Sequence, residues 1–82
     1  MSAEILIIDD NSDIREILND LIIDAGYITR LAANYNQALS EIDKKLPDVA
    51  IIDVKLDKGD NDGIELLNHI KNKNKNIPVI II

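Results

Sequence analysis

The sequence predicts an α/β fold in which helices cover both faces of a parallel β-sheet. Two observations carry this prediction. Short apolar runs, typical of strands buried on both faces, alternate with longer stretches whose apolar residues recur at helical spacing. Asp, Asn, Gly and Pro residues separate these segments. The resulting order is βαβαβαβ, and right-handed crossovers place such strands parallel in one sheet.

The first strand is the unbroken apolar run at residues 5–8, which ends at the Asp-Asp-Asn-Ser of residues 9–12. Asn11 or Ser12 can cap the helix that follows. This helix carries one apolar stripe and an outward polar face: the stripe is Ile14, Ile17, Leu18, Leu21 and Ile22, and the polar face is Arg15, Glu16, Asn19 and Asp20. Gly26 ends the helix in the usual C-terminal position.

The second strand, residues 27–32, mixes Thr29 and Arg30 among its apolar residues, which is typical of an edge or near-edge strand. A second helix begins at about Tyr35. It ends before Pro47, because the residue ahead of a proline disfavours helical backbone. Its predicted inward residues are Ala38, Leu39 and Ile42.

The third strand, residues 49–52, repeats the buried pattern of the first. A polar loop at residues 54–62 leads to a third helix, with Asp62 as its cap. The residues of this helix expected to face inward are Ile64, Leu67 and Ile70. Residues 79–82 form a last strand.

Composition limits the function. The chain has 82 residues, a formal net charge of −6 and no cysteine, so one small domain without disulfides is expected. The acidic balance argues against direct contact with nucleic acid, which needs clustered Lys or Arg. The sequence has neither an apolar run long enough to span a membrane nor a basic signal-peptide flank. We therefore expect a soluble, cytoplasmic protein with no membrane partner.

Carboxylates follow two of the buried strands. Asp9 and Asp10 follow the first, and Asp53 follows the third. In open α/β sheets, ligands bind beyond the carboxyl ends of the strands. If the two strands are neighbours, three mutually repelling carboxylates converge, and a hard cation such as Mg²⁺ would neutralise them. The alternative is that each aspartate merely caps a helix or a turn.

These motifs together resemble the receiver domain of two-component signalling. The residues that carry the resemblance are 5–10, 49–53, 62–67 and 77–81. The family implies a flavodoxin-like (CheY-like) doubly wound sheet, with the order 2-1-3-4 for the strands present. Residues 1–82 would then be the N-terminal portion of a receiver domain. The fifth strand, the last two helices, the switch Ser or Thr and the phosphate-pairing Lys would all lie after Ile82.

The resemblance also implies a role for each matching residue. Asp53 would be the phosphoacceptor of a phosphorelay, loaded by a sensor histidine kinase. Asp10 and Asp53 would bind Mg²⁺ directly, Asp9 would act through coordinated water, and the main-chain carbonyl of Lys55 would be a further ligand. Such a domain assists its own phosphorylation and is not an independent enzyme.

The loop after Asp53 departs from the usual family pattern. Asp57 stands where receivers commonly have a proline, and Gly63 lies two residues later than the usual glycine. The longer loop resembles the NtrX-type nitrogen-regulation receivers, which continue into AAA+ and DNA-binding modules. This implies a transcription-regulatory output.

Two alternatives to a phosphorelay switch concern function. The altered loop favours a pseudo-receiver that serves only as a protein-interaction module, whereas the intact acid cluster favours phosphorylation. A hydrolase using the same cluster lacks an accompanying base such as His. Because the apolar residues 79–82 would leave a bare sheet edge, we also expect this chain to self-associate.

Overall fold

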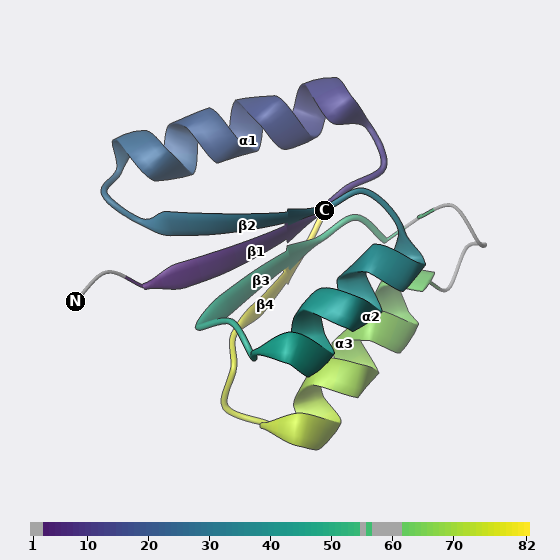
Figure 1. Cartoon of the computed structure of the whole chain (residues 1–82). Helices are drawn as coiled ribbons and strands as arrows, with labels where there is room; N and C mark the ends of the chain where they lie inside the picture. The colour runs from purple at the N-terminus through teal and green to yellow at the C-terminus, as the bar shows by residue number, and fades with distance from the viewer. Residues whose placement is uncertain (1–2, 55, 57–61) are drawn as a thin grey trace.

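The computed structural model describes residues 3–54, 56 and 62–82. Its elements are β1 (Glu4–Ile8), α1 (Ser12–Asp24), β2 (Ile28–Ala32), α2 (Tyr35–Lys44), β3 (Val49–Ile52), α3 (Asp62–Lys73) and β4 (Val79–Ile81). The strands are parallel and stand in the order β2-β1-β3-β4, with α1 on one face and α2 and α3 on the other (Figure 1). This confirms the doubly wound α/β sheet, the order 2-1-3-4 and the edge position of the second strand.

The predicted helix boundaries have visible local causes. The Asn11 side chain accepts hydrogen bonds from the backbone N–H groups of Asp13 and Ile14, at 2.9 and 3.1 Å, and so caps α1. Gly26 follows the end of α1 with φ of +96°, in the left-handed region that favours glycine. Asn34 caps α2 through a hydrogen bond from the N–H of Gln37 at 2.8 Å. These caps fix where the chain leaves and re-enters the sheet.

The hydrophobic core lies between the sheet and the α2–α3 layer. Alternate residues of β1 and β3 point to this face, as the two-residue period of a strand requires. The buried cluster includes Leu6 and Ile8 of β1, Ala50 and Ile52 of β3, Ala38 and Ile42 of α2, and Leu66 and Ile70 of α3. The predicted inward face of the second helix is thereby confirmed for Ala38 and Ile42, and Leu39 packs at its margin.

The apolar stripe predicted for α1 is only partly buried. Leu18 and Ile22 are half-buried, but Ile17 and Leu21 remain 56% and 62% exposed, and Ile14 is exposed as well. Among the described residues α1 is the one helix on its face of the sheet, where it packs mainly on β1 and β2 (Figure 1). Helical spacing shows which residues share a face; burial needs a neighbour on each side of the stripe.

The polar face predicted for α1 is also corrected in part. Glu16 and Asp20 are exposed as expected, but Arg15 and Asn19 are half-buried. The Asn19 side chain accepts a hydrogen bond from the Thr29 hydroxyl at 2.6 Å, which ties α1 to the edge strand β2. A polar residue beside an apolar stripe can therefore face the sheet when the sheet offers it a hydrogen-bond partner.

The inward face of α3 differs from the prediction. Ile70 is buried and Leu67 is half-buried, but Ile64 is 40% exposed. Leu66 takes the buried position instead, one turn before Ile70. Asp62, the predicted cap, is the first described residue of the helix. The physical reason is that α3 packs beside α2 as well as on the sheet, which rotates its buried stripe toward Leu66.

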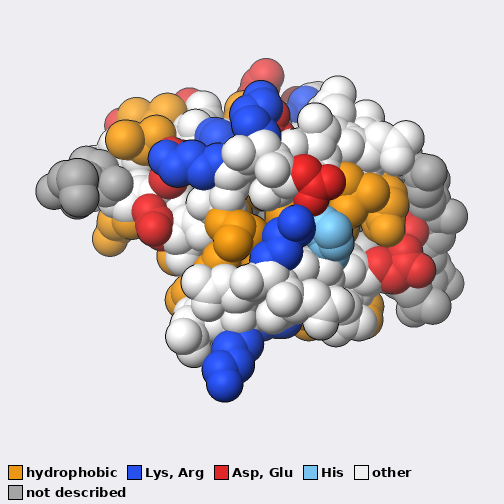
Figure 2. All heavy atoms as spheres, turned by 60° about the horizontal axis from the view of Figure 1, so that its bottom comes forward, with side chains coloured by type: hydrophobic (Ala, Val, Ile, Leu, Met, Phe, Trp, Pro, Cys, Tyr) orange, Lys and Arg blue, Asp and Glu red, His pale blue; other side chains and the backbone are white. Residues whose placement is uncertain are grey.

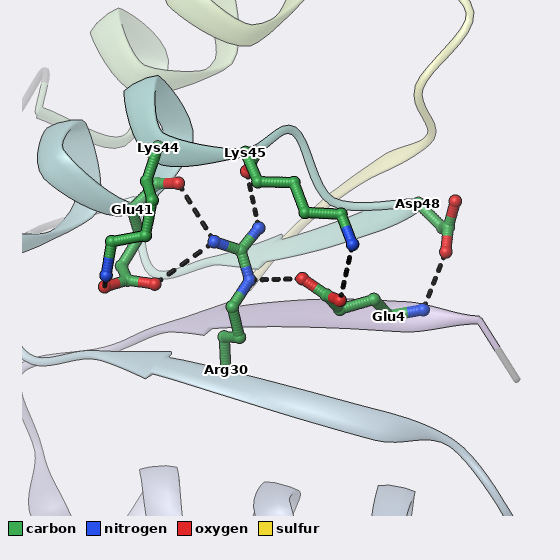
Figure 3. Close-up of polar contacts among 6 residues, drawn as sticks. All are labelled: Glu4, Arg30, Glu41, Lys44, Lys45 and Asp48. Atoms are coloured by element: carbon green, nitrogen blue, oxygen red, sulfur yellow. Dashed lines mark hydrogen bonds and ion pairs between the residues drawn. The ribbon is translucent and has the colours of Figure 1, made fainter.

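A network of ion pairs and hydrogen bonds lies on the amino-terminal side of the sheet (Figure 3). The Arg30 guanidinium of β2 donates to the carbonyls of Glu41 and Lys45, at 3.0 and 2.6 Å, at the C-terminal end of α2. It also forms ion pairs with the carboxylates of Glu41 and Glu4, at 3.1 and 2.5 Å. The Glu4 N–H in turn donates to the Asp48 carboxylate at 2.7 Å. Arg30 therefore fastens α2 to the sheet.

We expect Arg30→Met to lower the free energy of unfolding by about 2 kcal/mol, since it leaves partly buried acceptors without their charged donor. The Arg30 and Glu4 side chains are only 17% and 18% exposed, so solvent screens the pair weakly. Urea unfolding measures the change. Lys44→Met is the matched control, because Lys44 pairs with Glu41 from a 68% exposed position. Equal losses in the two variants would contradict the assignment.

Candidate metal centre

The pairing of β1 with β3 brings the predicted acidic residues together. Ile8 pairs with Ile52, so the residues that follow, Asp9 and Asp53, leave the sheet side by side. The backbone N–H of Asp53 donates to the carbonyl of Ile8 at 2.8 Å, which continues the ladder one residue past β3. β1 and β3 are therefore neighbours, as the predicted convergence of the carboxylates at the carboxyl edge of the sheet requires.

Asp9 is held from several directions. Its side chain is buried, with 3% exposure, and its Oδ1 accepts a hydrogen bond from the Asn11 N–H at 2.9 Å. Its backbone N–H donates to the carbonyl of Ala32 in β2 at 3.2 Å. Its own carbonyl accepts from Arg15 at 2.8 Å. The Asp9 side chain is thus held in place before any ligand binds.

Asp9, Asp10 and Asp53 form one carboxylate cluster. Each offers an oxygen, and these oxygens all lie within 4.8 Å of one another. Asp9 is buried, Asp53 half-buried and Asp10 exposed, so the cluster opens to solvent on one side. The donor set of carboxylates, with water on the open side, fits a hard divalent cation.

Part of the predicted site lies outside the described residues. This holds for Lys55, whose carbonyl was expected to be a further ligand, and for residues 57–61 of the longer loop. From residue 62, where α3 begins, the chain is described without a gap, and Asp62 there is buried.

Gly63 positions the end of β3, a role that its spacing from Asp53 did not reveal. Its N–H donates to the carbonyl of Val54 at 3.1 Å. A Cβ atom at Gly63 would lie 2.6 Å from the Val54 Cα and 2.7 Å from the Asp53 carbonyl oxygen, closer than real Cβ atoms come. The absence of a side chain therefore lets α3 start directly against the backbone that carries Asp53. Two signals were present in the sequence: a glycine in a helical first turn, where it is otherwise unfavourable, and its likeness to the glycine usual in receivers, two residues later here.

The single histidine of the sequence has an ionic partner on a neighbouring helix. His69 Nε2 of α3 lies 3.0 Å from the Asp43 carboxylate of α2, and Lys73 Nζ lies 3.3 Å from the same oxygen. Hydrogen bonds from His69 and then Lys73 hold the pKa of Asp43 below its usual value. Figure 2 shows the histidine on this face among acidic and basic side chains. The contact between His69 and Asp43 thus links α3 to α2.

No helix in the described part of the chain combines the length and the apolar character needed to cross a membrane.

Sequence comparison finds a matching family model and similar proteins. A model of the response regulator receiver domain matches residues 5–82. The chain is 37% identical over 82 residues to the nitrogen assimilation regulatory protein NtrX of Azorhizobium caulinodans, covering 100% of the chain and 18% of that protein. It is 43% identical over 81 residues to sporulation initiation phosphotransferase F of Bacillus subtilis, covering 99% of the chain and 64% of that protein. The chain thus spans less than two thirds of either relative.

Solved structures give the same result. NtrX from Brucella abortus, in complex with ADP, matches with a TM-score of 0.88 and 34% identity, over 99% of this chain and 18% of that one. The chemotaxis response regulator CheY4 of Vibrio cholerae matches with a TM-score of 0.89 and 29% identity, over 99% of this chain and 68% of that one. The fold and the strand order of this chain therefore agree with those of solved structures.

Proposed function

Since this chain belongs to the response regulator receiver domain family of two-component signalling, we propose that it accepts a phosphoryl group on Asp53 from a sensor histidine kinase. The observation that supports this most directly is the convergence of Asp9, Asp10 and Asp53, whose carboxylate oxygens lie within 4.8 Å of one another. A phosphoacceptor needs such a cluster beside it because a carboxylate and a phosphate repel each other unless a cation intervenes.

Each residue of the cluster has a distinct part in this proposal. Asp10 and Asp53 would hold Mg²⁺ through their carboxylates, Asp9 through bound water, and Lys55 through its main-chain carbonyl. Bound Mg²⁺ supplies positive charge that offsets the repulsion between the nucleophile and the incoming phosphoryl group. A carboxylate oxygen of Asp53 attacks phosphorus; the P–O bond of an acyl phosphate forms as the P–N bond to the donor imidazole breaks. Asp53 meets this donor at the open side of the cluster, next to exposed Asp10.

The output of the switch would lie in other modules. The likeness to nitrogen regulatory proteins, of which the chain covers 18%, supports an attached transcription-regulatory output with AAA+ and DNA-binding modules. The chain itself carries a net charge of −6, which supports a signalling role without direct nucleic-acid contact. The alternative is a pseudo-receiver that only binds partners; the complete carboxylate cluster favours phosphorylation.

We also propose that the chain by itself associates with further copies of itself. Apolar side chains remain exposed on the α1 face and at the edge strand β4, among them Ile17, Leu21 and Ile80. Exposed apolar surface and an unpaired strand edge both favour association. Light scattering over a concentration series tests this, and a mass that stays monomeric throughout would count against it.

A Mg²⁺ titration of this chain, followed by thermal melting, tests the assembled cluster. Metal that binds only the folded state raises its stability, by about 2.7 kcal/mol at 100 times the dissociation constant. We expect the melting temperature of the parent chain to rise with Mg²⁺ and that of Asp10→Asn to respond far less.

Asp20→Asn is the matched control, because it removes the same charge from an exposed position of α1. It should respond to Mg²⁺ as the parent does. A parent chain that melts cooperatively but ignores Mg²⁺ would refute the metal site and favour the interaction module.

A further inference from the structure

We propose that Arg15 is a positioning residue that holds the peptide between Asp9 and Asp10 and thereby sets the affinity of the cluster for a divalent cation. This inference rests on the proposed function, since it concerns metal binding at the same carboxylates. Arg15 touches the main chain of the cluster rather than its carboxylates: its Nη1 donates to the carbonyl oxygen of Asp9 at 2.8 Å.

The placement of Arg15 is unusual on electrostatic grounds. It lies in the first turn of α1, where its N–H donates to the carbonyl of the cap residue Asn11 at 3.0 Å. The helix dipole disfavours a cation at this end and favours one at the C-terminal end, whose last turn contains no basic residue in α1. Its neighbours Ile14 and Glu16 are exposed, whereas Arg15 is half-buried. The hydrogen bond to the Asp9 carbonyl offsets the unfavourable interaction between the Arg15 charge and the helix dipole.

The Asp9 carbonyl belongs to the peptide group that joins the Cα atoms of Asp9 and Asp10, and these two Cα atoms carry the adjacent carboxylate side chains. Fixing its oxygen fixes the orientation of that peptide. The Asp9 side chain is secured independently by the Asn11 N–H at 2.9 Å. Asp10 is exposed, and no hydrogen bond to its side chain is found in the described part of the chain, so its backbone sets its direction. Arg15 therefore matters most for Asp10, the proposed ligand that is otherwise free to turn toward solvent.

Two effects of Arg15 on cation affinity have opposite signs. Its positive charge repels a bound cation, so removing the charge alone would tighten binding. Its hydrogen bond orders the Asp9–Asp10 peptide, so removing the bond would weaken binding. The guanidinium is bound to a carbonyl, and Arg15 is only partly buried, so solvent screens the repulsion. Groups that orient metal ligands typically change affinity by about 10–100-fold. We expect positioning to outweigh repulsion.

The experiment is a Mg²⁺ titration of this chain, with the affinity read from NMR chemical shifts, in the parent, Arg15→Met and Arg15→Lys. Arg15→Met keeps the aliphatic stem but loses both donor and charge, and it should bind Mg²⁺ about tenfold more weakly. Arg15→Lys keeps a charged donor and should recover most of the affinity. The amide resonance of Asp10 should shift in the metal-free Arg15→Met variant and less so in Arg15→Lys, a signature that a loss of stability alone would not produce.

The outcomes separate this inference from the proposed function. A parent chain that does not bind Mg²⁺ refutes the metal site, and the inference with it. A parent that binds, together with an Arg15→Met variant of equal or higher affinity, refutes the positioning role alone. If Arg15→Met does not melt cooperatively, Arg15→Leu, which also lacks both donor and charge, is judged by the same criterion. Affinity that falls equally in Arg15→Met and Arg15→Lys would also overturn the role of the hydrogen-bond donor.

Discussion

Asp53→Asn should abolish phosphoryl acceptance while leaving the fold intact. An amide has nearly the shape of a carboxylate but is not a nucleophile toward phosphorus, so the loss should be complete rather than partial. The fold should survive, because Asn keeps the shape of the side chain, and the backbone hydrogen bond from the N–H of residue 53 to the Ile8 carbonyl oxygen, at 2.8 Å, does not involve the carboxylate. Removing one of three clustered carboxylates also lowers their mutual repulsion, so stability should hold or rise.

The measurement is the intact mass of the chain after incubation with Mg²⁺ and a small acyl phosphate donor. The parent should gain one phosphoryl group that hydroxylamine removes, as an acyl phosphate requires. Asp20→Asn, which makes the same charge change at an exposed site on α1, should be labelled like the parent. Labelling that persists in Asp53→Asn would overturn the assignment of the acceptor. A parent that binds Mg²⁺ but is never labelled would favour the pseudo-receiver.

The position of the site could be predicted from the sequence because it depends on backbone rules. Buried strands end where the apolar run ends, and Asp9 and Asp53 follow those ends directly. Parallel strands bring their carboxyl ends to one edge, so the convergence needed only that β1 and β3 be neighbours, as they are. The edge-like composition of the second strand pointed the same way, because it left the other side of β1 available to β3.

The parts that could not be predicted depend on tertiary packing. Ile17 and Leu21 share a face with Leu18 and Ile22, yet they stay exposed, since periodicity does not show what covers a stripe. The sequence predicts that Arg15 faces outward, but in the structure its guanidinium donates a hydrogen bond to the backbone carbonyl of Asp9.

Gly63 is the third such case, and the structure reverses the sign of the stability change that helix propensity alone would predict for its substitution. Judged by helix propensity alone, Gly63→Ala should stabilise α3 by about 1 kcal/mol, since glycine is a poor helix former. The structure predicts the opposite sign. The new Cβ would meet backbone atoms of Val54 at 2.6 Å and of Asp53 at 2.7 Å, and backbone cannot swing aside as a flexible side chain can. Overpacking of this kind typically costs about 1–3 kcal/mol, occasionally more.

We therefore expect Gly63→Ala to lower the free energy of unfolding by up to about 2 kcal/mol after the propensity gain is subtracted, because both close contacts are with backbone atoms. Urea unfolding measures this, with Asn68→Ala as the control, because Asn68 is exposed on the same helix and should show the propensity gain without the clash.

The same substitution should also weaken Mg²⁺ binding. Relief of the clash must move either the start of α3 or the backbone of residues 53–54, and moving the latter displaces Asp53 from the cluster. A Gly63→Ala chain as stable as the parent, with unchanged Mg²⁺ affinity, would contradict the close approach. A loss of stability with unchanged affinity would instead show that the helix yields and that the strand end carrying Asp53 stays fixed.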